Sequence, residues 1–170
     1  MSNPRASLKA STQPSLKGRA LRLLSRREHS RIELERKLQR CKPEGQTPED
    51  FSSVLKRALD DLQAKGLISE ARVAESVVHQ RASRLGQARI QHELKSKGLD
   101  DGLVRQTLQD LKASEPERAR GVWLKKFGSA PQTPAEHAKQ TRFLASRGFS
   151  SEAIRYALST KAPFTDPTSA

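Results

Sequence analysis

Three short segments of the same construction recur along the chain, and they constrain its fold more than any other feature. In each, a cation is followed by glycine and then by an apolar residue: Lys65-Gly66-Leu67, Lys97-Gly98-Leu99 and Arg147-Gly148-Phe149. Glycine adopts the left-handed conformation that ends many α-helices, the cation interacts favourably with the negative helix end, and the apolar residue can fold back onto the last turn. The pattern predicts three helix ends built in the same way.

The rest of the chain also favours helix over strand. Leu (20) and Ala (19) greatly outnumber Val (6) and Ile (4), and the first two are the better helix formers. Apolar residues follow helical spacing most clearly from Phe51 to Leu62, where they recur at intervals of three and four. We expect helices near residues 18–28, 30–41, 48–65, 69–84, 86–97, 100–112, 114–127, 133–147 and 150–159.

Helix starts are marked as clearly as helix ends. Residues 30–33, 114–117 and 133–136 each read Ser or Thr followed three positions later by Glu, which fits a reciprocal capping box. Thr47 precedes Pro48 and two acidic residues, a combination that caps a helix and complements its N-terminal dipole. These signals predict four of the helix starts.

The chain also resembles itself. Residues 30–38 match residues 86–94 at an offset of 56, and residues 93–100 match residues 143–150 at an offset of 50. A period of about 50 residues holds three helices, and units of this size stack on their neighbours in repeat proteins. We therefore predict an all-α fold of three tandem three-helix-bundle repeats in an elongated arrangement.

Composition agrees with small cores. Leu, Ile, Val and Phe number 35 of 170 residues, close to the level of about 20% below which a charged chain is expected to be disordered. Residues 1–27 contain no acidic residue and are rich in Ser, Lys and Arg, which fits a flexible basic tail or, alternatively, a transit peptide. The expected organisation is a disordered basic tail (1–16), three-helix repeats at 17–66, 67–113 and 114–159, and a disordered tail (160–170).

The charge of the chain restricts its partners. The formal net charge is +13, and residues 1–66 alone hold 15 basic and 8 acidic residues. Such an excess points to nucleic acid or to an acidic protein surface.

No apolar run reaches the roughly 20 residues needed to cross a bilayer, and a single cysteine forms no internal disulfide. We expect a cytoplasmic protein without membrane contact.

Residues that could support catalysis are sparse. No His or Cys pattern resembles a metal or nucleophile site, and adjacent carboxylates on a helix point in different directions. The histidines are interpreted as exposed or half-buried and the cysteine as a small apolar filler. We expect no enzyme activity, no metal and no cofactor; the residues considered are His29, His79, His92, His137, Cys41, Asp60, Asp61, Asp100 and Asp101.

Basic side chains are the remaining candidates for function. They form two groups away from the apolar positions Leu21, Leu24, Leu34 and Leu38, with Arg22 and Arg26 expected one helical turn apart. A purely solvated face, partly neutralised by neighbouring glutamates, is the alternative. The candidate contact residues are Arg22, Arg26, Arg27, Arg31, Arg36, Lys37 and Arg40, followed by Arg81, Arg84, Arg89, Lys95 and Lys97.

Four segments together resemble the bacterial RecX family. They are ALRLLSRREHSRIELERKL (20–38), LDDLQAKGLISEARVAES (59–76), RIQHELKSKGLD (89–100) and RFLASRGFSSEAIRYAL (142–158). The resemblance runs in order over roughly residues 18–158. It implies tandem three-helix repeats. It also implies a regulator that binds the RecA filament on DNA and inhibits its extension, its recombinase activity and its coprotease activity. Such a regulator would modulate homologous recombination, DNA repair and the SOS response.

A second function is compatible with the same pattern. The turn from Gly98 to Asp100 has the length found in helix-turn-helix motifs, so a free-standing DNA-binding protein is the alternative prediction. As a RecA regulator the protein would contact DNA phosphates weakly and without sequence preference, whereas the alternative predicts tight, sequence-selective binding to naked DNA. The absence of a long apolar heptad run favours a monomer.

Overall fold

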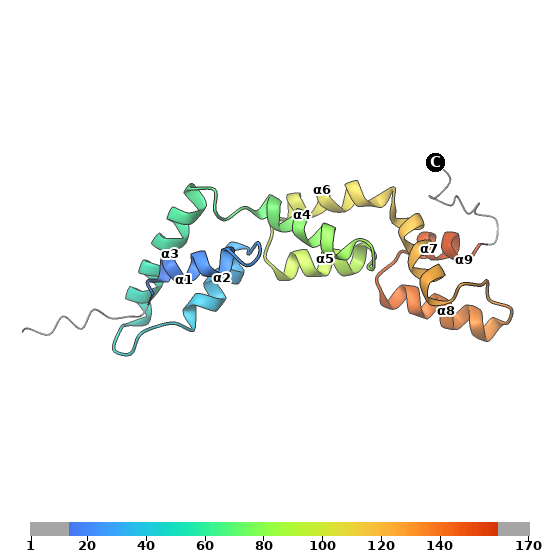
Figure 1. Ribbon diagram of the computed structural model, residues 1–170, viewed down its shortest axis with the longest axis horizontal. Coiled ribbons are helices and arrows are strands. Elements are labelled where there is room, and N and C mark those ends of the chain that lie inside the picture. Colours follow the sequence, from blue (N-terminus) through green and yellow to red (C-terminus); the bar gives the residue numbers. More distant parts are fainter. Residues whose placement is uncertain (1–13, 160–170) are drawn as a thin grey trace, which may run out of the picture. The chain divides into compact units, whose positions relative to one another are not determined.

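Residues 14–159 are described by the computed structural model, and within this range the chain forms nine α-helices and no strand (Figure 1). The helices group into three successive bundles of three, which confirms the all-α prediction. Of the predicted tails, 1–16 and 160–170, residues 1–13 and 160–170 lie outside the described residues, while Ser15 is the N-cap and Leu16 the first residue of a helix.

The first bundle belongs to a compact unit that ends at Ile68. It consists of α1 (Leu16–Leu24), α2 (Arg31–Gln39) and α3 (Pro48–Ala64). Apolar side chains at helical spacing on α3 meet those of α1 and α2, and together they form one small core. Its buried members are Ala20, Leu34, Leu38, Phe51, Leu55, Leu59, Leu62 and Ile68.

The other two bundles form a second compact unit, from Ser69 onward. Helices α4 (Glu70–Arg81), α5 (Gln87–Ser96) and α6 (Asp101–Lys112) enclose Val73, Ala74, Val77, Ile90, Leu94, Leu99 and Val104. Helices α7 (Glu115–Lys126), α8 (Pro134–Ser146) and α9 (Ser151–Leu158) enclose Ala119, Val122, Trp123, Leu144, Phe149, Ala153, Ile154 and Ala157. Each bundle thus has a core of seven or eight buried apolar residues.

The predicted helix starts are confirmed in part. Ser30 and Glu33 form the reciprocal capping box, and the Thr47 side chain accepts from the backbone N–H of Asp50. The box predicted at Ser114 is wrong: Ser114 has helical backbone angles, and its hydroxyl donates to the carbonyl of Leu111 instead. Because α6 runs almost directly into α7, no extended residue is left there to cap the helix.

The three glycine-containing helix ends take the predicted left-handed conformation. The φ angles are +69° at Gly66, +72° at Gly98 and +83° at Gly148. After the last two glycines, the apolar residue folds back and is buried. After Gly66 this prediction is wrong, because Leu67 is 40% exposed and Ile68 takes the place in the core.

The first helix ends earlier than its sequence pattern predicts. Helix α1 stops at Leu24, and the backbone N–H of Arg26 bonds to the carbonyl of Leu23 in a tight turn. Arg22 and Arg26 therefore do not stand one turn apart on a helix. Leu21, predicted as an apolar core position, is 40% exposed, because the core face of this short helix is occupied by Ala20 and its partly buried neighbours.

The second and third bundles are joined through their main chains. The N–H groups of Gly86 and Ala88 donate to the carbonyls of Arg147 and Gly148 at 2.9 and 3.1 Å. This approach requires glycine at position 86, because a Cβ atom there would lie 2.2 Å from the carbonyl oxygen of Gly148. The N-cap of α5 is thus held directly against the end of α8.

Two charged side chains of α7 complete this joint. The Glu115 side chain is 3% exposed and accepts hydrogen bonds from the backbone N–H of Gln87 and the hydroxyl of Ser150. The Arg118 guanidinium donates to the carbonyls of Ala82 and Leu85 at 2.9 and 2.8 Å. Burial lowers the pKa of Arg118, and the charge of Glu115 opposes this change.

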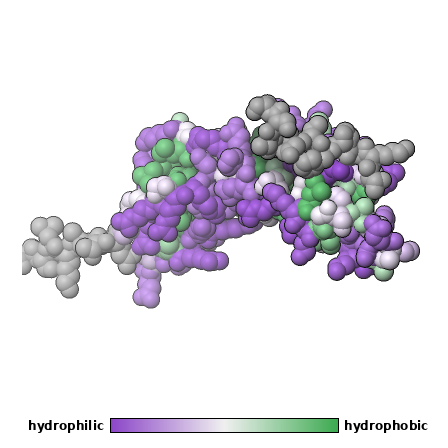
Figure 2. All heavy atoms as spheres, turned by 45° about the vertical axis from the view of Figure 1, so that its right-hand side comes forward, coloured by the Kyte–Doolittle hydropathy of each residue, from purple (hydrophilic) through white to green (hydrophobic). Residues whose placement is uncertain are grey.

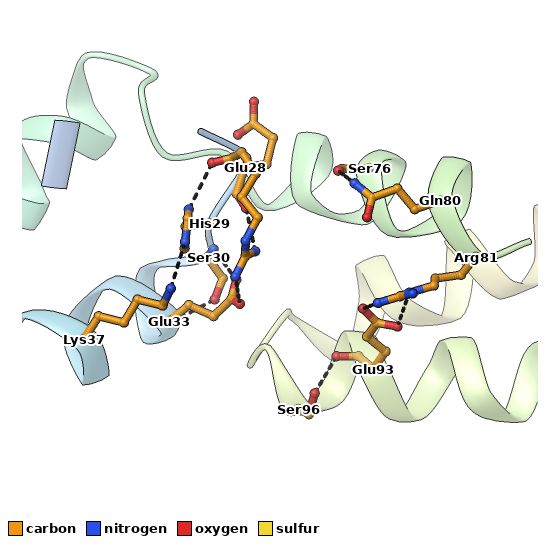
Figure 3. A network of polar contacts seen from close by, with 11 residues as sticks. Glu28, His29, Ser30, Glu33, Lys37, Ser76, Gln80, Arg81, Glu93 and Ser96 are labelled. Atoms are coloured by element: carbon orange, nitrogen blue, oxygen red, sulfur yellow. Dashed lines mark hydrogen bonds and ion pairs between the residues drawn. The ribbon is translucent and has the colours of Figure 1, made fainter. Parts of the chain in front are cut away.

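One histidine contradicts the interpretation that all four are exposed or half-buried. His29 is 2% exposed. Its Nδ1 lies 2.9 Å from the carbonyl of Arg27 and must donate, so Nε2 accepts from the ammonium of Lys37 at 3.3 Å (Figure 3). Burial lowers the pKa of His29, with the charges of Arg27 and Lys37 acting in the same direction.

Replacing Gly86 by alanine should therefore open the joint between the second and third bundles. The added Cβ meets backbone atoms that have no room to move, so we expect a loss of about 2–3 kcal/mol in the free energy of unfolding, measured in urea. Gly121→Ala is the matched control, because its Cβ meets nothing within 4 Å inside α7. It should be neutral or stabilising by up to about 1 kcal/mol. Equal stabilities of the two variants would contradict the conclusion that the joint requires glycine at position 86.

Protonation of His29 should destabilise the fold as pH falls. The pKa of the folded state lies below the ordinary value of 6.5, so below pH 6.5 the unfolded chain binds the proton first. The free energy of unfolding should then decrease by up to about 1.4 kcal/mol per pH unit, the limit for one proton. Urea unfolding from pH 7.5 to 5.5 measures this slope. His29→Gln should flatten it, whereas replacement of the exposed His92 by Gln should leave it unchanged.

Candidate functional site

The first predicted group of bases lies on α1, the following turn and α2. Arg22, Arg26, Arg36 and Arg40 are exposed. Within residues 14–159, the side chains of Arg22, Arg26 and Arg40 form no hydrogen bond or ion pair, while Arg36 has an interaction of its own. These three arginines are therefore the members of the group whose charge is most available to a partner.

Other members of this group hold the first bundle together. Arg31 donates to Asp60 at 2.5 Å and to Gln63 at 2.9 Å, so it links α2 to α3. Arg27 pairs with Glu33 at 3.1 Å, and Lys37 is the hydrogen-bond donor to His29. The sequence did not show that the charged ends of these residues are already engaged.

The second predicted group, in the second compact unit, also contains both bases that are engaged within the fold and bases that are exposed. Arg81 on α4 contacts both carboxylate oxygens of Glu93 on α5, at 3.0 and 3.5 Å (Figure 3). Arg89 donates to the carbonyl of Ser146 at 3.1 Å and so adds to the joint between bundles. Lys95 lies 3.5 Å from Asp101. Lys97 is the C-cap of α5 and is half-buried. Arg84 lies in the segment that follows α4 and is exposed.

The described surface is largely hydrophilic. Hydrophilic residues cover most of the face shown in Figure 2. Among residues 14–159, no cluster of three or more His, Cys, Asp or Glu side chains could hold a metal ion. None of the helices in that range combines the length and apolar character needed to cross a membrane.

Sequence reasoning did not identify Glu115 or Arg118 as joining residues. Glu115 lies between Ser114 and Glu117 of the apparent capping box, and Arg118 occupies an ordinary helical position. Across the joint their partners are three backbone groups and the Ser150 hydroxyl, 28 to 36 residues away, and no local sequence signal points to such partners. Only the packing of α7 against the segment between α4 and α5 reveals their role.

Comparison with protein families matches all three bundles. The models described as the first, second and third three-helix domains of RecX match residues 17–44, 69–108 and 114–158. Two solved structures share the fold: a regulatory protein RecX (TM-score 0.67, 23% identity, 82% of this chain and 69% of that one), and RecX from Lactobacillus salivarius (TM-score 0.64, 21% identity, 84% and 92%).

Relatives of much higher identity extend over most of the chain. The regulatory protein RecX of Leptothrix cholodnii is 50% identical over 151 residues, covering 88% of this chain and 92% of its own. That of Herminiimonas arsenicoxydans is 47% identical, covering 89% and 96%. With three matching domains in order and relatives of this similarity, the chain belongs to the RecX family of regulatory proteins.

Proposed function

We propose that this protein binds the RecA filament on DNA and inhibits its extension, its recombinase activity and its coprotease activity. It would thereby modulate recombination and the SOS response. The observation that carries this proposal is membership of the RecX family over all three bundles, with relatives that are named regulatory proteins.

The mode of action follows from the charges. A RecA filament presents acidic protein surface and DNA phosphates, and exposed arginines are attracted to both. Arg22, Arg26 and Arg40 support such contacts, because their charges are not neutralised by neighbouring side chains among residues 14–159. By occupying the filament groove or capping its end, the protein acts without catalysis, as a monomer in the cytoplasm, and touches naked DNA only weakly.

The proposal predicts inhibition of RecA on single-stranded DNA. At sub-stoichiometric to equimolar protein, RecA-dependent ATP hydrolysis and strand exchange should both decrease, and the effect should weaken as salt is added. Unchanged RecA activity at equimolar protein would contradict the proposal.

The exposed arginines of the first bundle provide a sharper test. Substitution of Arg22, Arg26 and Arg40 by glutamine should raise the half-inhibitory concentration about tenfold, because three charge contacts are removed. The control variant replaces the exposed Arg57, Arg105 and Arg142 by glutamine and has the same net charge. It should change the half-inhibitory concentration by less than about twofold. Equal effects of the two variants would mean that net charge alone, and not this group, determines inhibition.

An independent DNA-binding activity is the competing function. Helix α5 ends at Ser96 and α6 begins at Asp101 with Asp100 as N-cap, a connection of the length found in helix-turn-helix motifs. A mobility shift on naked duplex DNA separates the two proposals. Tight, sequence-selective binding would favour the competing function, whereas weak and salt-sensitive binding agrees with a filament regulator.

A further inference from the structure

A basic hollow lies beside the joint between the second and third bundles. Its volume is about 350 Å³. Three elements contribute to it: the segment after α4, the C-terminal half of α7, and α8 with its C-cap residue. The lining residues are Ser83, Arg84, Val122, Lys125, Lys126, Phe143 and Arg147. Four of these seven side chains are cations and none is an acid.

The joint fixes the main chain on both sides of this hollow. On one side, Arg84 lies between Ala82 and Leu85, whose carbonyls both accept hydrogen bonds from Arg118. On the other side, the carbonyl of Arg147 accepts from the N–H of Gly86 at 2.9 Å. The two arginines are thus brought together by the same contacts that join the bundles, and the hollow is formed before any ligand arrives.

Arg147 is held more tightly than a surface arginine usually is. Its guanidinium carbon lies 4.6 Å from the centre of the Phe143 ring, a stacking geometry that is favourable for a cation. Its Nε atom is buried and has no hydrogen-bond partner among the described residues. The stacking on Phe143 and the burial of Nε hold the Arg147 side chain in place at the edge of the hollow.

The helix end explains only part of the charge. Lys125 and Lys126 lie in the last turn of α7, where cations stabilise the negative end of the helix dipole. That effect does not require Arg84 and Arg147 in the same hollow. Four cations without a counter-charge in the lining repel one another and raise the local affinity for an anion.

We propose that this hollow binds backbone phosphates of a nucleic-acid strand. Arginine forks match the oxygens of a phosphate, and lysines add strong point charges. A strand presents successive phosphates to the four cations, whereas one carboxylate side chain offers a single charge. Val122 and Phe143 supply an apolar wall for the sugar. The inference deepens the proposed DNA contact of this regulator and rests on it.

The test measures binding of a fluorescein-labelled single-stranded oligothymidylate to the full chain by anisotropy, with RecA absent. The test variant replaces Arg84, Lys125 and Lys126 by glutamine; all three are exposed, and Arg147 is kept because it packs on Phe143. The matched control replaces Arg105, Lys112 and Lys139, also one arginine and two lysines that are exposed and outside the hollow. Circular dichroism and urea unfolding verify that both variants remain folded.

We expect the test variant to bind about tenfold or more weakly at low salt, and the control less than about threefold more weakly. The slope of log affinity against log salt should become shallower by about 1 to 2 in the test variant, since fewer phosphates are neutralised. Equal losses in the two variants would overturn the proposal, because they would indicate a diffuse charge effect.

Two further measurements complete the test. Inorganic phosphate at millimolar concentration should compete poorly with the strand; competition as strong as that of unlabelled oligothymidylate would mean a site for the free ion and would also overturn the proposal. If the test variant bound the strand normally but inhibited RecA poorly, the hollow would be a protein contact and not a strand site. Since the anisotropy assay contains no RecA, its result is independent of whether the protein inhibits the filament.

Discussion

The second compact unit depends on a contact that only glycine permits. With no Cβ at position 86, the backbone at the start of α5 approaches the end of α8 closely enough for two main-chain hydrogen bonds between bundles. Glu115 and Arg118 satisfy the neighbouring polar groups that this approach removes from water. Bundles with cores of seven or eight residues gain stability from such a joint, since each buries little apolar surface by itself.

The same structure shows how the large positive charge is divided. Arg31, Arg81, Arg89 and Arg118 each connect two elements through carboxylates or carbonyls. Arginine is suited to this use because its planar fork bonds two acceptors at once. Fewer than the 32 Lys and Arg side chains are therefore unengaged, and within residues 14–159 the exposed arginines Arg22, Arg26, Arg40 and Arg84 are among those that remain available to a partner.

Local rules predicted the fold well and the site only in part. Capping residues, glycine helix ends and apolar spacing act within one or two turns, so they predicted the nine helices of residues 14–159 to within a few residues. These local rules did not predict the early end of α1 or the exposure of Leu21, because both depend on how a short helix packs against its neighbours. Of the predicted bases, the sequence could not tell Arg84, with its exposed charge, from Arg81, which is paired with Glu93.

The sequence by itself determined the helical class, the three-bundle repeat and the family, because these follow from local backbone preferences and from a pattern spread over the whole chain. Only the tertiary structure decided which charges are engaged within the fold, and that Arg84, Lys125, Lys126 and Arg147 line one hollow. These four residues come from three separated segments. Their proximity arises from the close approach of two backbones, which leaves no local mark in the sequence.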